Sequence, residues 1–62
     1  MYRVYIIDYH GAYWLRRWVG DCPLLSTKRD HAMTFKTFGA ALEQVHRLKK
    51  LGNDAHIDSV GR

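Results

Sequence analysis

"YRVYIIDYHGAYWLRRWV" (residues 2–19) consists of two runs of β-branched and aromatic residues with a His-Gly pair between them. Such runs are typical of β-strands, and a glycine beside a polar residue is typical of a turn. We therefore expect a strand over residues 2–9, a turn at His10 and Gly11, and a second strand over residues 12–19. Together they predict an antiparallel β-hairpin.

The turn sets the register of this hairpin, and the register decides where its aromatic side chains lie. With a two-residue turn, opposed residues share a face of the hairpin. One face then carries aromatic and basic side chains: Arg3, Tyr5, Tyr9, Trp14, Arg16 and Trp18. The other face is the better core: Tyr2, Val4, Ile6, Leu15 and Val19. A three-residue turn would shift the pairing by one and move both tryptophans to the core face, so the sequence leaves two registers open.

The most regular pattern in the chain lies between Thr37 and Gly52. Apolar residues recur there at spacings of three and four: Phe38, Ala41, Leu42, Val45, Leu48 and Leu51. This spacing predicts an amphipathic helix. Thr37 is the expected N-cap, and Gly52 is the expected left-handed C-cap after a last turn rich in basic residues.

The remaining segments predict shorter elements. Residues 23–30 are expected to form a loop, residues 31–35 a short strand, and residues 54–59, which alternate in polarity, a half-buried strand. The predicted fold is therefore α+β, in the order β-β-(β)-α-β. It has an antiparallel sheet of three to four strands with one amphipathic helix packed on one face. We expect residues 1–62 to form a single small domain, frayed at residues 60–62.

Composition narrows the setting in which this chain acts. Its single cysteine, Cys22, excludes an intramolecular disulfide and favours a reducing compartment, so we expect a cytoplasmic protein. The sequence has no apolar run of signal-peptide or membrane-spanning length, and we expect no membrane partner.

Motifs for catalysis or cofactor binding are not recognisable in the sequence. The four histidines, His10, His31, His46 and His56, lack the spacing of metal ligands. Cys22, Ser26 and Ser59 lie in no known nucleophile signature, and the five glycines do not cluster into a phosphate-binding loop. We therefore expect no catalytic residue, no metal and no cofactor, and a protein that is not an enzyme.

The aromatic and basic hairpin face is the best candidate for a functional surface. Tryptophan, tyrosine and arginine dominate protein-binding hot spots, and the same residue types can stack unpaired bases. Ten basic against six acidic residues, a net charge of +4, also favour an acidic or polyanionic partner. The predicted partner-binding residues are Arg3, Tyr5, Tyr9, Trp14, Arg16, Trp18, Lys28 and Arg29.

Two functions fit such a face. The first is a binding protein that occludes a macromolecular partner, a protein in preference to a nucleic acid, with self-association into a homodimer through the same face. The alternative is a basic nucleic-acid-binding protein that stacks single-stranded bases on the aromatic and arginine side chains. The dependence of binding on salt would separate them.

The stretch "AMTFKTFGAALEQVHRLKKLGNDAHI" (residues 32–57) resembles a layout found in small phage and prophage accessory proteins. In that layout a segment of form A-x-x-F leads into a helix and a short closing strand. The resemblance implies a non-enzymatic protein that binds and blocks a host complex, such as a defence nuclease. It is a fold-level analogy and assigns no role to any single residue.

Overall fold

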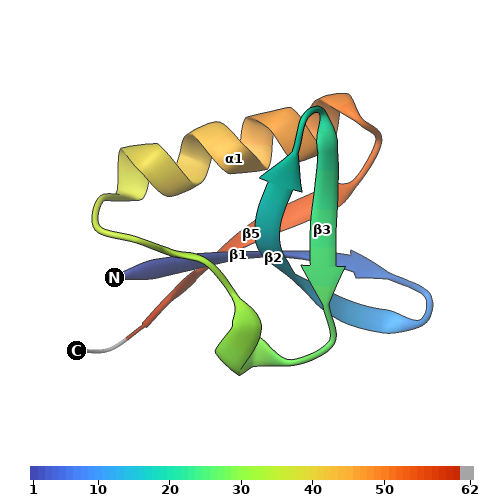
Figure 1. The fold of residues 1–62 in the computed structure, drawn as a ribbon, viewed down its shortest axis with the longest axis horizontal. Coiled ribbons are helices and arrows are strands. Elements are labelled where there is room, and N and C mark those ends of the chain that lie inside the picture. The colour runs from blue at the N-terminus through green and yellow to red at the C-terminus, as the bar shows by residue number, and fades with distance from the viewer. Residues whose placement is uncertain (61–62) are drawn as a thin grey trace.

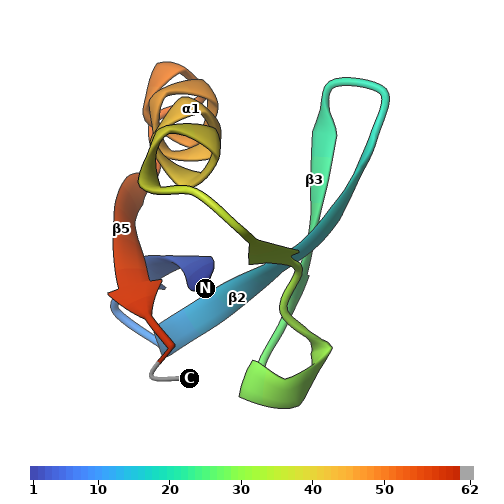
Figure 2. The ribbon, with the colours of Figure 1, turned by 90° about the vertical axis from the view of Figure 1, so that its left-hand side faces the viewer.

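A central strand, β1 (Tyr2–Asp8), organises the sheet in the computed structural model, which describes residues 1–60. The other elements are β2 (Gly11–Val19), β3 (Cys22–Ser26), a 3-10 turn (Arg29–His31), β4 (Thr34–Phe35), α1 (Phe38–Lys50) and β5 (Asp54–Ser59). Within residues 1–60 the strands form one antiparallel sheet, which is curled, and α1 packs against it (Figure 1, Figure 2). The predicted α+β class is confirmed, with one more strand in the sheet than the sequence predicts.

The curl of the sheet follows from how the strands share β1. Strand β5 pairs with β1 from Tyr2 to Ile7 and so fills one edge. Strands β2 and β4 therefore divide the other edge, with β2 pairing residues 5–8 and β4 pairing residues 2–3. Beyond Trp14, β2 leaves β1 and continues beside β3, which forms an outer edge of the sheet. The β2–β3 pair consequently extends away from β1 as an arm (Figure 2).

The hairpin turn lies one residue earlier than predicted. Tyr9 and His10 form the turn, Asp8 pairs with Gly11, and Tyr5 pairs with Trp14. The Asp8 carboxylate accepts a hydrogen bond from the His10 backbone N–H at 2.7 Å, which is the local bonding by which aspartate stabilises turns. Because the pairing moves by two residues relative to the predicted register, Tyr5 and Trp14 still share a face.

The loop predicted over residues 23–30 is wrong in its first half, because β3 spans Cys22–Ser26. Proline cannot donate a ladder hydrogen bond, but an outer strand has one unpaired edge and tolerates it. Pro23 lies opposite Trp18, and Leu25 lies opposite Leu15. Of the short strand predicted over residues 31–35, only Thr34 and Phe35 pair with β1.

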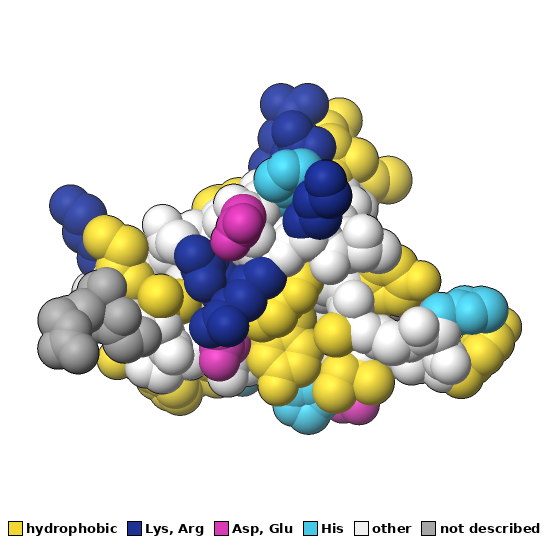
Figure 3. Space-filling view, turned by 90° about the horizontal axis from the view of Figure 1, so that it is seen from below, with side chains coloured by type: hydrophobic (Ala, Val, Ile, Leu, Met, Phe, Trp, Pro, Cys, Tyr) yellow, Lys and Arg dark blue, Asp and Glu magenta, His cyan; other side chains and the backbone are white. Residues whose placement is uncertain are grey.

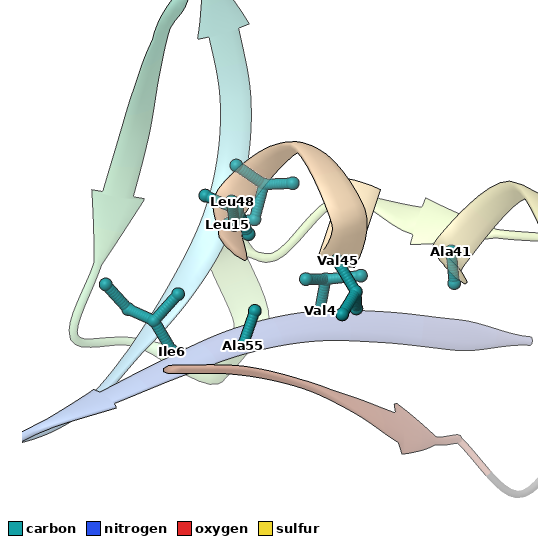
Figure 4. Packing of buried hydrophobic residues seen from close by; sticks show 7 residues of the cluster. All are labelled: Val4, Ile6, Leu15, Ala41, Val45, Leu48 and Ala55. Carbon is teal, nitrogen blue, oxygen red and sulfur yellow. The ribbon is translucent and has the colours of Figure 1, made fainter. Parts of the chain in front are cut away.

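The core lies between α1 and one face of the sheet. Its buried residues are Val4, Ile6, Leu15, Ala41, Val45, Leu48 and Ala55 (Figure 4). The predicted stripe of α1 thus contributes its middle positions, whereas its end residues Phe38 and Leu51 are exposed. Val19, predicted for the core, is exposed as well.

The predicted ends of α1 are confirmed. Thr37 Oγ1 accepts a hydrogen bond from the Ala40 N–H at 3.2 Å, and Gly52 has φ 90° just after the C-cap. At the end of the chain, the Val60 N–H donates to the Met1 carbonyl at 2.8 Å, so the fraying predicted from residue 60 does not begin there. The fraying predicted for residues 61–62 lies outside the described residues. Within residues 1–60, no helix is long and apolar enough to cross a membrane.

Candidate functional site: an aromatic and charged sheet face

A β-bulge in β2 separates the two tryptophans. The pairing of β2 with β3 shifts between Leu15 and Arg17, which inserts one extra residue into β2. Because side chains alternate between the faces of a strand, one extra residue reverses the alternation beyond it. The predicted placement of Trp14 and Trp18 on one face is therefore wrong in both registers that the sequence leaves open.

Trp18 lies on the helix side of the sheet. Its ring is half-buried against the core, and its Nε1–H donates to Gln44 Oε1 on α1 at 2.7 Å. The guanidinium carbon of Arg47, also on α1, lies 3.8 Å from the ring centroid. An open hollow beside it is lined by Trp18, Asp21, Arg47, Lys50 and Leu51. Trp18 thus joins β2 to α1 and does not belong to the predicted binding face.

Trp14 lies on the opposite side of the sheet, away from α1. We call this side the open face; alternation along β1, β2 and β5 places on it Arg3, Tyr5, Ile7, Ala12, Trp14, Asp54, His56 and Asp58. Seen from the side away from α1, it has a hydrophobic area at its centre bordered by charged and histidine side chains (Figure 3).

Three half-buried rings from three adjacent strands form the centre of the open face. The Tyr5 and Trp14 ring centroids are 5.0 Å apart at an interplanar angle of 46°. On the other side of Tyr5, His56 stacks at 5.4 Å and 28°. We call Tyr5, Trp14 and His56 the aromatic row. The sequence assigns His56 no binding role, because only the pairing of β5 with β1 brings it beside Tyr5.

Arg29 reaches this row from the 3-10 turn. Its guanidinium carbon lies 5.6 Å from the Trp14 ring centroid, and its Nη2 lies 2.9 Å from Asp58 Oδ2 on β5. Arg29 is a predicted site residue that the fold brings to the open face, whereas Asp58 was not predicted. Nothing in the local sequence connects these residues, which are 29 positions apart.

The open face carries both signs of charge. Arg3 is half-buried opposite Asp58 in the β1–β5 ladder, and its Nε has no hydrogen-bond partner. His56 Nε2 lies 2.9 Å from Asp54 Oδ1, a distance that permits an ion pair when His56 is protonated, although the contact lacks hydrogen-bond geometry. Two carboxylates from β5 therefore flank the aromatic row.

The other predicted site residues are not part of the aromatic row. Tyr9 is 94% exposed at the hairpin turn, where its ring lies 4.3 Å from that of His10. Arg16 lies in the bulge of β2, and Lys28 precedes the 3-10 turn; both are exposed. Of the eight predicted residues, Arg3, Tyr5, Trp14 and Arg29 are thus gathered on the open face.

Candidates for metal binding or catalysis gain little from the structure. Within residues 1–60, no three His, Cys, Asp or Glu side chains are grouped to hold a metal ion. Ser26 Oγ and His31 Nδ1 lie 3.2 Å apart, but the same hydroxyl accepts the Lys28 N–H at 3.1 Å. This pair ties the loop after β3 together, and we assign it a structural role.

Comparison of the chain with family models, curated proteins and solved structures finds no match.

Proposed function

We propose that this protein is a small, non-enzymatic binding protein that occludes a partner protein with its open face. The observation that carries the proposal is that Tyr5 and Trp14 are half-buried yet stand outside the core, which closes without them on the other side of the sheet. Large aromatic side chains that are not needed for the core and lie together on one face are typical of binding hot spots.

The charges on the open face favour a protein partner over a nucleic acid. A phosphate backbone is bound by cations that are free to neutralise it. Here Asp54 and Asp58 lie on the same face as the aromatic row, and Asp58 already pairs with Arg29. Mixed charge around an aromatic centre is the usual composition of a protein-binding surface, whose polar rim sets specificity.

The resemblance of residues 32–57 to small phage and prophage accessory proteins supports the same class of function by analogy. We accordingly propose that the partner is a host complex, such as a defence nuclease, and that the protein acts by covering part of its surface. We place this activity in the cytoplasm, where a reducing environment would keep the exposed Cys22 as a thiol.

Affinity capture with matched variants tests the proposal. Tagged wild-type protein, Trp14→Ala and Phe38→Ala would be incubated with lysate of the source cell or its host, with and without nuclease. Phe38 is an exposed aromatic residue on α1, outside the open face, and serves as the control. We expect a stoichiometric protein that survives nuclease, is retained by Phe38→Ala and is lost with Trp14→Ala. Equal retention by Trp14→Ala, or loss of all bound material with nuclease, would contradict the proposal.

The salt dependence of binding gives a second test. We expect the affinity for the captured partner to fall by less than about tenfold between roughly 50 and 200 mM salt, because an aromatic interface releases few counterions. Titration of the purified partner by calorimetry at several salt concentrations measures this. A fall of several orders of magnitude would contradict an interface centred on the aromatic row, because it would require many ion pairs between the two proteins.

A further inference from the structure

We infer that the open face is a receptor for an arginine side chain presented by the partner protein, and that Arg29 occupies this place in the free protein. The inference rests on the proposed function, because it names the chemistry by which the same face recognises its partner. It identifies Trp14 and Asp58 as the two groups that bind the incoming guanidinium.

Arg29 already shows the geometry of such binding. Its guanidinium lies 5.6 Å from the Trp14 ring centroid and 2.9 Å from the Asp58 carboxylate. An aromatic ring and a carboxylate are the two groups with which proteins bind a guanidinium, because the ring attracts the cation and the carboxylate accepts its N–H groups. The fold has thus placed one group of each kind around a single guanidinium position.

The side chain of Arg29 is weakly held in this position. It is 54% exposed, Asp58 is 31% exposed, and only Nη2 approaches the carboxylate. Solvent-exposed pairs of this kind contribute little to stability, and 5.6 Å is close to the outer limit for a cation over a ring. A competing arginine could therefore replace Arg29 at small cost.

Replacement requires no opening of the loop. The backbone on both sides of Arg29 is tied by hydrogen bonds from the His31 N–H to the Lys28 carbonyl and from the Ala32 N–H to the Arg29 carbonyl. The Met33 N–H donates to the Leu15 carbonyl and attaches the loop to β2. Rotation of the Arg29 side chain alone would uncover Trp14 and Asp58.

The surrounding charges also suit a basic segment of the partner. When the Arg29 side chain rotates away, Asp58 loses its ion pair. Asp54 lies on the same face of β5, on the other side of His56. Among the described residues, the part of the open face formed by β1 and β5 then carries the carboxylates of Asp54 and Asp58 and the guanidinium of Arg3. Rotation of Arg29 away from Asp58 thus makes the part of the open face around β5 locally acidic. Such a surface is complementary to an arginine-bearing peptide.

A titration with short peptides tests this inference. The probe is Ac-Gly-Arg-Gly-NH2, and its control carries citrulline, which has the same shape without the charge. Binding is followed by NMR through the indole N–H signals of Trp14 and Trp18, the latter being an internal reference on the other side of the sheet. We expect the arginine peptide, and not the citrulline peptide, to shift the Trp14 signal while the Trp18 signal stays in place.

Variants of the protein test which side chains bind the guanidinium of the peptide. Removing the internal competitor with Arg29→Ala should tighten binding about five- to tenfold, because the free site is no longer occupied for most of the time. Adding Asp58→Asn to Arg29→Ala should weaken binding at least about tenfold by deleting the acceptor. Arg47→Ala removes an arginine from Trp18 instead and should leave the Trp14 response unchanged. Circular dichroism confirms that each variant is folded.

The inference is overturned if Arg29→Ala does not tighten binding, if citrulline binds as well as arginine, or if Arg29→Ala dimerises or binds a single-stranded oligonucleotide instead of the peptide. Its failure is distinguishable from that of the proposed function. If capture of a partner is lost with Trp14→Ala but is unchanged by Arg29→Ala and by Asp58→Asn, the proposed function is supported and the arginine receptor is rejected.

Discussion

At the scale of single residues, Trp14 and Trp18 have opposite roles although they are four positions apart in one strand. Trp18 is bonded to Gln44, covered by Arg47 and packed on the core. Trp14 contacts Tyr5 and Arg29 on the open face. The difference comes from the single bulge between them, since the residue type and the local composition are the same.

This difference predicts unequal losses of stability. Trp18→Ala removes packing against the core and leaves Gln44 without its partner, so we expect it to lower the free energy of unfolding by about 2–4 kcal/mol. Trp14→Ala removes mainly one aromatic pair, and we expect a loss of about 1 kcal/mol. Urea denaturation followed by circular dichroism measures both. Equal losses would mean that Trp14 is structural and that the open face is part of the stabilising framework.

At the scale of elements, α1 is defined by local signals at both ends. Thr37 caps the first turn, and the basic residues Arg47, Lys49 and Lys50 lie in the last turn, where the helix dipole favours cations. After Leu51, Gly52 takes a left-handed conformation, and the Asn53 N–H donates to the Leu48 carbonyl at 3.1 Å. These contacts close the helix before β5 begins.

Two glycines of this region should respond in opposite ways to alanine. Gly39 is the second residue of α1 and has open space at its Cβ position, so Gly39→Ala should raise stability by about 0.5 kcal/mol. Gly52 has φ +90°, so Gly52→Ala should lower stability by about 1 kcal/mol or more through backbone strain, although space is open there too. Thermal unfolding of the two variants provides the comparison. Stabilisation by Gly52→Ala would show that the helix does not end in this conformation.

At the scale of the whole molecule, one thin core stabilises the protein. Within residues 1–60, seven buried residues join α1 to β1, β2 and β5, and partly buried residues such as Tyr2, Phe35 and Ile57 pack around them. A chain of this length is near the lower limit for folding without disulfides or metals. The aromatic row of the open face lies outside this core.

A core this small should tolerate few truncations. Leu15→Ala removes a fully buried side chain and should cost about 2–5 kcal/mol, a large share of the roughly 3–9 kcal/mol expected for a domain of this size. Leu25, paired with Leu15 across β2 and β3 but 37% exposed, is the control. We expect Leu25→Ala to cost about 1 kcal/mol. Denaturant titration measures the free energy of unfolding of both variants. A Leu15→Ala variant as stable as the wild type would contradict the assignment of Leu15 to the core.

The sequence by itself determined the elements whose signals are local. The caps and periodicity of α1, the alternation of residues 54–59 and the two β-favouring runs of residues 2–19 all depend on neighbours within a few positions. The first run also predicts that Arg3 and Tyr5 share one side of β1, because alternation along one strand needs no tertiary information.

Only the tertiary structure decided the register, the bulge and the composition of the open face. Cross-strand hydrogen bonds and the burial of Leu15 and Trp18 under α1 determine where β2 takes its extra residue. The contact of Arg29 with Asp58 and the stacking of His56 on Tyr5 join segments far apart in the chain. Local preferences carry no information on such contacts, since they depend on which strands become neighbours when the core closes.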